Sequence, residues 1–269
     1  METITIRKNK RLQWRRRRGC HIVVAMVSLM TAMAVSSSSQ AQVTRFAPLK
    51  KGSASVSVRE LTIPGKARDE FQRGMKKLEE HDEKGSLRHF DAATQIYPGY
   101  YEAHYNQGVA ELHLGKDDKA LEAFQKAIDL SGGQYARAQF GYALMLCRQG
   151  KAQEAERAVR YGLVTDPNIS EGHLVLGLAL LKLHRADEAA KSAREALELN
   201  DSSSPKAFLI LADVEAAKGN YGAQVRYLDA YMKWRPNDPN KAMLRSVREA
   251  AKRLEMNQAS MSQESASVR

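Results

Sequence analysis

From residue 67 onward, apolar side chains recur every three or four positions, which is the spacing of one face of an α-helix. A longer period is superimposed on this pattern. Glycine or alanine stands at five positions 34 or 35 residues apart, namely Gly74, Gly108, Ala143, Gly177 and Ala212. A second, mostly small set keeps the same register at Ser86, Ala120, Ala155, Ala189 and Gln224. Such a period predicts an array of repeated units instead of one globular core.

Each unit has the pattern of two amphipathic helices joined by a tight turn. Gly115, Gly150 and Gly219 are placed to supply the left-handed residue that ends a first helix, and His184 stands at the corresponding turn of another unit. The small residues are expected to let the two helix backbones approach closely. Larger side chains then fill the space behind them, at Phe90, Phe124, Val159, Ala193 and Leu228. One such hairpin cannot bury its apolar face, whereas stacked neighbours can.

Two stretches carry a more specific pattern, one through residues 101–108, 114–116 and 120–127, the other from Ala136 to Pro167. Both resemble the tetratricopeptide repeat. Five repeats are expected at about residues 67–100, 101–135, 136–169, 170–204 and 205–238. The resemblance implies an all-α fold, a right-handed solenoid of helical hairpins that serves as a protein-interaction scaffold. It implies no particular activity.

The segments that flank the repeats are expected to differ in structure. Residues 239–256 place apolar side chains on one side and basic ones on the other, which predicts a helix that caps the last repeat. Residues 257–269 are rich in serine and glutamine and are expected to form a disordered tail. Residues 42–66 are expected to be a linker, extended or disordered.

The first 41 residues have the order of a secretory signal peptide. Basic residues up to Arg18 precede an uncharged apolar run from Ile22 to Val35, and small polar residues follow. Cleavage is expected before Gln42. The alternative is an uncleaved anchor that tethers the chain to a membrane. With either, the repeats are expected to be exported, and with cleavage they would be periplasmic or secreted.

Charge and cysteine content exclude several classes of function. The net charge is +11 over 269 residues, but residues 1–42 alone contribute +7 of it. The near balance of the remainder argues against a nucleic-acid partner. Only Cys147 remains after the leader, so no internal disulfide is expected, and an apolar helical setting predicts a core thiol. Because no phosphate loop, serine elbow or zinc-spaced set occurs, we expect no catalytic residues, no metal and no cofactor.

The resemblance implies a binding surface on the inner wall made by the first helices. In the family, the fifth and ninth places of each repeat tend to face a concave groove. With Asn106 added for its amide, the predicted partner-binding groove consists of Phe71, Met75, Tyr105, Asn106, Val109, Phe140, Leu144, Leu174 and Leu178. The fifth repeat has Leu209 and Asp213 at these places. A surface of this kind suits an apolar or amphipathic peptide.

Two occupants of the predicted groove are open. One is a foreign protein or peptide. The other is the chain's own segment 43–64, in which Val56, Val58, Leu61 and Ile63 are spaced as in an extended strand. The leading hypothesis is an exported, non-enzymatic adaptor, and the alternative is a membrane-tethered envelope assembly factor.

Overall fold

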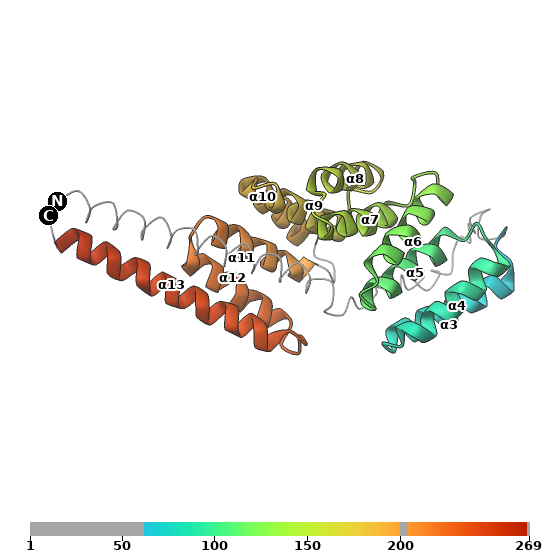
Figure 1. The fold of residues 1–269 in the computed structure, drawn as a ribbon, viewed down its shortest axis with the longest axis horizontal. Coiled ribbons are helices and arrows are strands. Elements are labelled where there is room, and N and C mark those ends of the chain that lie inside the picture. The colour runs from blue at the N-terminus through green and yellow to red at the C-terminus, as the bar shows by residue number, and fades with distance from the viewer. Residues whose placement is uncertain (1–61, 200–203, 268–269) are drawn as a thin grey trace, which may run out of the picture. The chain divides into compact units, whose positions relative to one another are not determined.

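Helices alone build the part of the chain that the computed structural model describes, residues 62–199 and 204–267 (Figure 1). These residues contain eleven α-helices and one short 3₁₀ helix, η1 (Ser204–Lys206). They divide into two compact units, one that ends at Ala207 and one that begins at Phe208. The all-α fold that the sequence predicts is therefore confirmed for these residues.

The first unit consists of four helical hairpins in chain order. The first helix of a hairpin is called helix A below and the second helix B. The four pairs are α3 (Gly65–Glu79) with α4 (Glu83–Ile96), α5 (Tyr101–His113) with α6 (Asp117–Leu130), α7 (Ala136–Arg148) with α8 (Ala152–Thr165), and α9 (Ser170–Lys182) with α10 (Ala186–Glu198). Within each pair the two helices pack on each other, and the B helices of the first three hairpins also pack on the next helix A.

Small residues on the A helices let the hairpins close. A Cβ atom placed on Gly108 would lie 2.6 Å from the ring of Phe124, and one on Gly74 would lie equally close to the ring of Phe90. Both phenylalanines are buried on their B helices. The close approach expected from the repeat pattern is thus present, because glycine leaves room for the aromatic ring.

The turns between helices A and B share a left-handed residue. Gly115, Gly150 and Gly219 have φ angles of 71°, 80° and 76°. His81 and His184 occupy the equivalent turns with φ angles of 58° and 59°. Two of the five turns therefore place a side chain where the backbone favours glycine.

Ion pairs join neighbouring hairpins of the first unit. Arg148 of α7 pairs with Asp117 of α6 at 2.8 Å from Nε to Oδ2. Arg185, at the start of α10, pairs with Glu156 of α8 at 2.7 Å from Nη1 to Oε2. Because these pairs are partly exposed, each adds little to stability, but they favour one order of stacking.

The second unit contains α11 (Ala207–Ala217) apart from its first residue, α12 (Tyr221–Trp234) and α13 (Lys241–Ser267). Residues from all three helices meet in one core: Leu209, Ala212, Leu228, Tyr231, Leu244 and Val247. Helix α13 packs along α12, so the expected helix after the fifth hairpin is present.

Helix α13 is longer than the sequence pattern suggests. The pattern predicts an end near Met256 and a disordered tail from residue 257, whereas the helix continues to Ser267. Gln258 donates a hydrogen bond from Nε2 to the carbonyl oxygen of Gly219, at 3.1 Å, in the turn between α11 and α12. This contact holds the helix against its neighbour beyond the last buried apolar side chain.

The predicted signal peptide and residues 42–61 of the predicted linker lie outside the described residues. The described chain starts at Thr62, and Ile63 is buried. None of the described helices is both long and apolar enough to cross a membrane.

Candidate partner-binding surface

The A helices of the first unit bring the predicted groove residues into one row. Helix α3 contacts α5, α5 contacts α7, and α7 contacts α9, so the four helices follow one another in chain order. All nine predicted residues lie on these helices. The repeat register thus places them on neighbouring helices although they span more than a hundred positions of sequence.

Five of the nine residues keep part of their surface exposed. These are Phe71, Met75, Tyr105, Val109 and Leu144, and they are called the inner stripe below. Phe71, Met75 and Val109 pack at the margin of a core cluster formed by Leu78, Phe90 and Ala110. The inner stripe is therefore anchored in the core and continuous across α3 and α5.

The other apolar residues of the predicted groove lie in the core and not on the surface. Phe140 is completely buried, and Leu174 and Leu178 are buried as well. The prediction that Phe140 faces a partner is wrong, because it is a core residue. The reason is that two glycines make room for its ring. A Cβ atom on Gly162 of α8 or on Gly172 of α9 would lie 2.6 Å from the Phe140 ring. Its ring fills the space that these glycines leave.

Asn106 is also buried, with 7% of its surface exposed. Its Nδ2 atom donates a hydrogen bond of 2.7 Å to the carbonyl oxygen of Glu102, one turn earlier on α5. The amide that was expected to hold a peptide backbone is therefore engaged with its own helix.

A polar and aromatic group borders the inner stripe from the second hairpin to the fourth. The ring of Tyr105 meets that of Tyr135 edge to face, with centroids 5.4 Å apart. Arg137 lies 3.8 Å from Glu171, measured from Nη1 to Oε2. Burial raises the pKa of the Tyr105 hydroxyl well above its usual range, so the hydroxyl stays neutral. Tyrosine and arginine are enriched where proteins bind partners.

The predicted groove did not include Tyr135, Arg137 or Glu171. A signal for two of them exists in the sequence, because the second place of the five repeats alternates in charge. That place holds Arg68, Glu102, Arg137, Glu171 and Lys206. Opposite charges on successive helices predict pairs between repeats, of which Arg137 with Glu171 is one.

Metal ligands do not gather in the part of the chain that the structure describes. Within residues 62–199 and 204–267, no group of three or more His, Cys, Asp or Glu side chains is placed to hold a metal ion. Cys147 is buried, and burial raises the pKa of its thiol to about 12, which keeps it protonated and unreactive.

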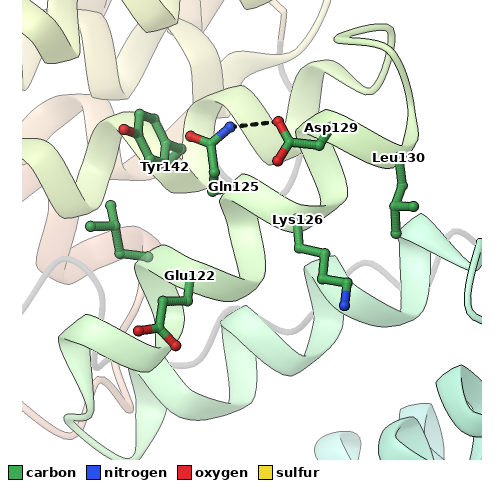
Figure 2. A pocket seen from close by; sticks show the side chains of 7 residues that line it. Glu122, Gln125, Lys126, Asp129, Leu130 and Tyr142 are labelled. Atoms are coloured by element: carbon green, nitrogen blue, oxygen red, sulfur yellow. Dashed lines mark hydrogen bonds between the residues drawn. The ribbon is translucent and has the colours of Figure 1, made fainter.

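The outer side of the second hairpin carries a shallow hollow. Six side chains of α6 line it together with Tyr142 of α7. Figure 2 shows Gln125 and Asp129 at its edge, joined by a hydrogen bond of 2.8 Å from Nε2 to Oδ1. It belongs to helix B, whereas the inner stripe belongs to the A helices, so it supplies a useful control surface.

Comparison with protein families agrees with the repeat geometry. Models of the tetratricopeptide repeat match residues 101–132 and residues 174–241. These two stretches therefore match the tetratricopeptide repeat in sequence. Repeats of this family are protein-interaction modules, typically without enzymatic activity. Among curated proteins, none matches the chain.

Solved structures with the same arrangement of helices include three of different origin. A thermophilic tetratricopeptide repeat protein from Thermus thermophilus has a TM-score of 0.59 and 21% identity over 69% of this chain and 98% of that one. PilW, described as a widely conserved type IV pilus biogenesis factor, has a TM-score of 0.59 and 20% identity over 72% of this chain and 92% of its own. The Cut9–Hcn1 hetero-tetramer of the APC/C has a TM-score of 0.63 and 15% identity over 69% of this chain and 36% of its own. At these identities the likeness concerns the fold.

Proposed function

We propose that this protein is an exported, non-enzymatic adaptor that binds a partner protein or peptide on the A helices of its first four repeats. The observation that carries the proposal is the inner stripe. Five large apolar side chains remain partly exposed on three consecutive A helices, in a family whose members bind proteins. Exposed apolar rows of this kind are typical of surfaces that a partner covers.

The chemistry around the stripe favours an amphipathic partner. Apolar side chains of a partner would cover Met75, Val109 and Leu144. The Arg137 guanidinium would offer hydrogen bonds at the margin. An amphipathic helix or an extended segment with alternating apolar residues meets both requirements.

Export is proposed from the sequence of residues 1–41, with cleavage before Gln42 and a periplasmic or secreted location. The second candidate is a membrane-tethered envelope assembly factor, in which the same apolar run from Ile22 to Val35 stays attached as an anchor. N-terminal sequencing of the mature protein separates the two. A first residue of Gln42 supports cleavage, whereas a retained N-terminus supports the tether.

Partner binding is tested by capture from an envelope extract with the wild-type chain and with the double variant Tyr105→Ala, Leu144→Ala. We expect the variant to keep its helical circular dichroism and to lose at least nine tenths of a specific partner. The matched control is Leu121→Ala, Leu130→Ala at the outer hollow, which should capture as well as wild type. Equal capture by the stripe variant would overturn the proposal.

A further inference from the structure

Positive charge is concentrated in the second unit, where α12 leads into α13. Residues 233–245 comprise the last two residues of α12, the connecting loop and the first residues of α13 (Figure 1). They contain one acidic residue, Asp238, and four basic residues: Lys233, Arg235, Lys241 and Arg245. This stretch is called the basic end below.

The acidic side chain of the basic end is turned inward. Asp238 is buried, with 7% of its surface exposed. Its Oδ2 atom accepts a 2.6 Å hydrogen bond from the hydroxyl of Tyr231, and Oδ1 accepts one of 2.8 Å from the backbone N–H of Asn240. One turn before the basic end, both carboxylate oxygens of Asp229 accept hydrogen bonds from the guanidinium of Arg248. Both carboxylates therefore have partners within the unit, which leaves the outward charge of the basic end positive.

Three of the four bases present their charge to solvent. Lys233 and Arg245 are exposed. Lys241 is half-buried, and its Nζ atom donates a 2.7 Å hydrogen bond to the carbonyl oxygen of Pro236. This hydrogen bond holds the ammonium group over the loop without neutralising its charge. The loop and the two helix ends thus carry a positive surface.

A large apolar side chain is exposed among these bases. Trp234, the last residue of α12, has 62% of its surface exposed. Pro236 and Pro239 are exposed in the loop that follows. Indole is apolar with a single polar N–H, and for this reason tryptophan is enriched where a membrane meets water. Anionic lipid headgroups attract lysine and arginine, so the basic end combines two features of membrane-binding surfaces.

A lipid surface fits the basic end better than an acidic macromolecule does. Proteins that bind single-stranded nucleic acid combine a basic groove with several aromatic rings, on which successive bases stack. Trp234 is the only aromatic residue among residues 233–245. A protein partner would have to supply a pocket for the indole ring. A bilayer accepts a single indole ring at its interface without such a pocket.

We propose that the basic end binds the surface of a membrane that contains anionic lipid. Trp234 inserts between the headgroups, and Lys233, Lys241 and Arg245 contact lipid phosphates. This binding is peripheral and does not depend on whether residues 1–41 are retained. It goes beyond the proposed adaptor function, because the second unit carries none of the inner stripe.

Fluorescence of Trp234 tests lipid binding in the full chain. The sequence has two tryptophans, so Trp14→Phe leaves Trp234 as the sole reporter. Vesicles of phosphatidylglycerol and phosphatidylcholine in equal parts should shift its emission to shorter wavelengths. Bromine-labelled acyl chains in the same vesicles should quench it, because bromine quenches only an indole that enters the lipid. Vesicles of phosphatidylcholine alone should have neither effect.

Charge reversal in this Trp14→Phe chain tests which residues bind. Lys233→Glu, Arg245→Glu should weaken binding to the anionic vesicles at least twentyfold, because each base near an anionic surface strengthens binding about fivefold. The matched control is Arg157→Glu, Arg194→Glu, at exposed positions of α8 and α10 in the first unit. It changes the net charge equally and should bind as tightly as the parent chain. Residues 1–41 differ in none of these three chains, so their own affinity for lipid cancels.

Three results would overturn the proposal. The first is an emission of Trp234 that does not respond to anionic vesicles, and the second is equal binding by the two charge-reversal variants. The third is a response to polyglutamate or to an oligonucleotide without one to vesicles, which would assign the basic end to an acidic macromolecule. The proposed function fails separately, because partner capture depends on Tyr105 and Leu144 and is measured without lipid.

Discussion

His173 donates a hydrogen bond from Nε2 to the carbonyl oxygen of Pro167, 2.9 Å away, and so joins helix α9 to the end of the preceding hairpin. The same contact occurs two repeats earlier, where Nε2 of His104 lies 3.2 Å from the carbonyl oxygen of Pro98. Both histidines hold the fourth place of their repeats. A carbonyl oxygen can only accept a hydrogen bond, so Nε2 of each ring is the donor in this contact. The two histidines therefore act as structural links between successive repeats.

His104 makes the stability of the array depend on pH. Burial lowers its pKa below the ordinary histidine value, so as pH falls the unfolded chain takes up a proton before the folded one does. Its contribution is complete above about pH 6.5 and is lost as pH falls below that value through the folded-state pKa. We expect the urea midpoint of the wild-type chain to fall over this window.

The variant His104→Gln isolates this effect, because glutamine can still donate to the Pro98 carbonyl but does not titrate between pH 5 and 7. Its urea midpoint should depend less on pH than that of wild type, when both are followed by circular dichroism. His113, whose pKa burial also lowers, should maintain a residual slope. An unaltered slope in the variant would contradict the assignment to His104.

The repeat register was predictable because it rests on backbone spacing. Gly74 and Gly108 mark where two helices touch, and Phe90 and Phe124 fill the adjoining space, so the sequence alone indicates the hairpins. The exposure of individual stripe residues was not predictable in this way. Phe140 is buried because of Gly172, which belongs to the next repeat, and such compensation between repeats has no fixed spacing.

The fifth repeat also contains a contact that the sequence pattern does not predict. Tyr231 occupies a place where other repeats keep alanine or glycine, and the sequence alone does not show how so large a side chain fits. In the structure it is fully buried and donates a 2.6 Å hydrogen bond to Asp238, beyond the end of α12. A buried polar pair of this kind depends on the path of the loop, which periodicity does not encode.

Overpacking at the helix contact should destabilise the first unit. In Gly108→Leu the new side chain meets the Phe124 ring, which a Cβ atom alone would approach to 2.6 Å. We expect a loss of about 1–3 kcal/mol in the free energy of unfolding, measured by urea titration. Gly65→Leu is the matched control, because nothing lies within 4 Å of its Cβ position. Equal stability of the two variants would mean that the contact between Gly108 and the Phe124 ring does not limit packing.

Relief of backbone strain at a turn should stabilise the chain. His184 is exposed and holds a φ angle of 59°, where a side chain is unfavourable and glycine is not. His184→Gly should raise the free energy of unfolding by about 0.5–1 kcal/mol, after the greater flexibility of glycine in the unfolded chain is counted. The reverse change, Gly150→His, should lower it by a similar amount. A lower thermal midpoint for His184→Gly would show that the histidine side chain contributes more than the turn costs.

Asp213 should make the second unit less stable as pH rises. It lies on the apolar helix α11 with 4% of its surface exposed, and burial raises the pKa of its carboxyl well above the usual value. Above about pH 4 the unfolded chain therefore loses this proton while the folded one retains it, so the free energy of unfolding falls with rising pH until the folded group ionises. The slope can reach about 1.4 kcal/mol per pH unit.

Asp213→Asn replaces the titrating carboxyl by a neutral amide. It should raise the urea midpoint at pH 8 above that of wild type, with little difference between the two chains near pH 4. Trp234 reports on the second unit, so fluorescence in a Trp14→Phe background follows the relevant transition. The matched control is Asp229→Asn, because Asp229 is exposed on α12 and pairs with Arg248. Removal of the Asp229 charge should not raise the urea midpoint at pH 8. A midpoint for Asp213→Asn below that of wild type at pH 8 would mean that the ionised carboxylate is stabilised by a group in its surroundings, and the predicted sign would then be wrong.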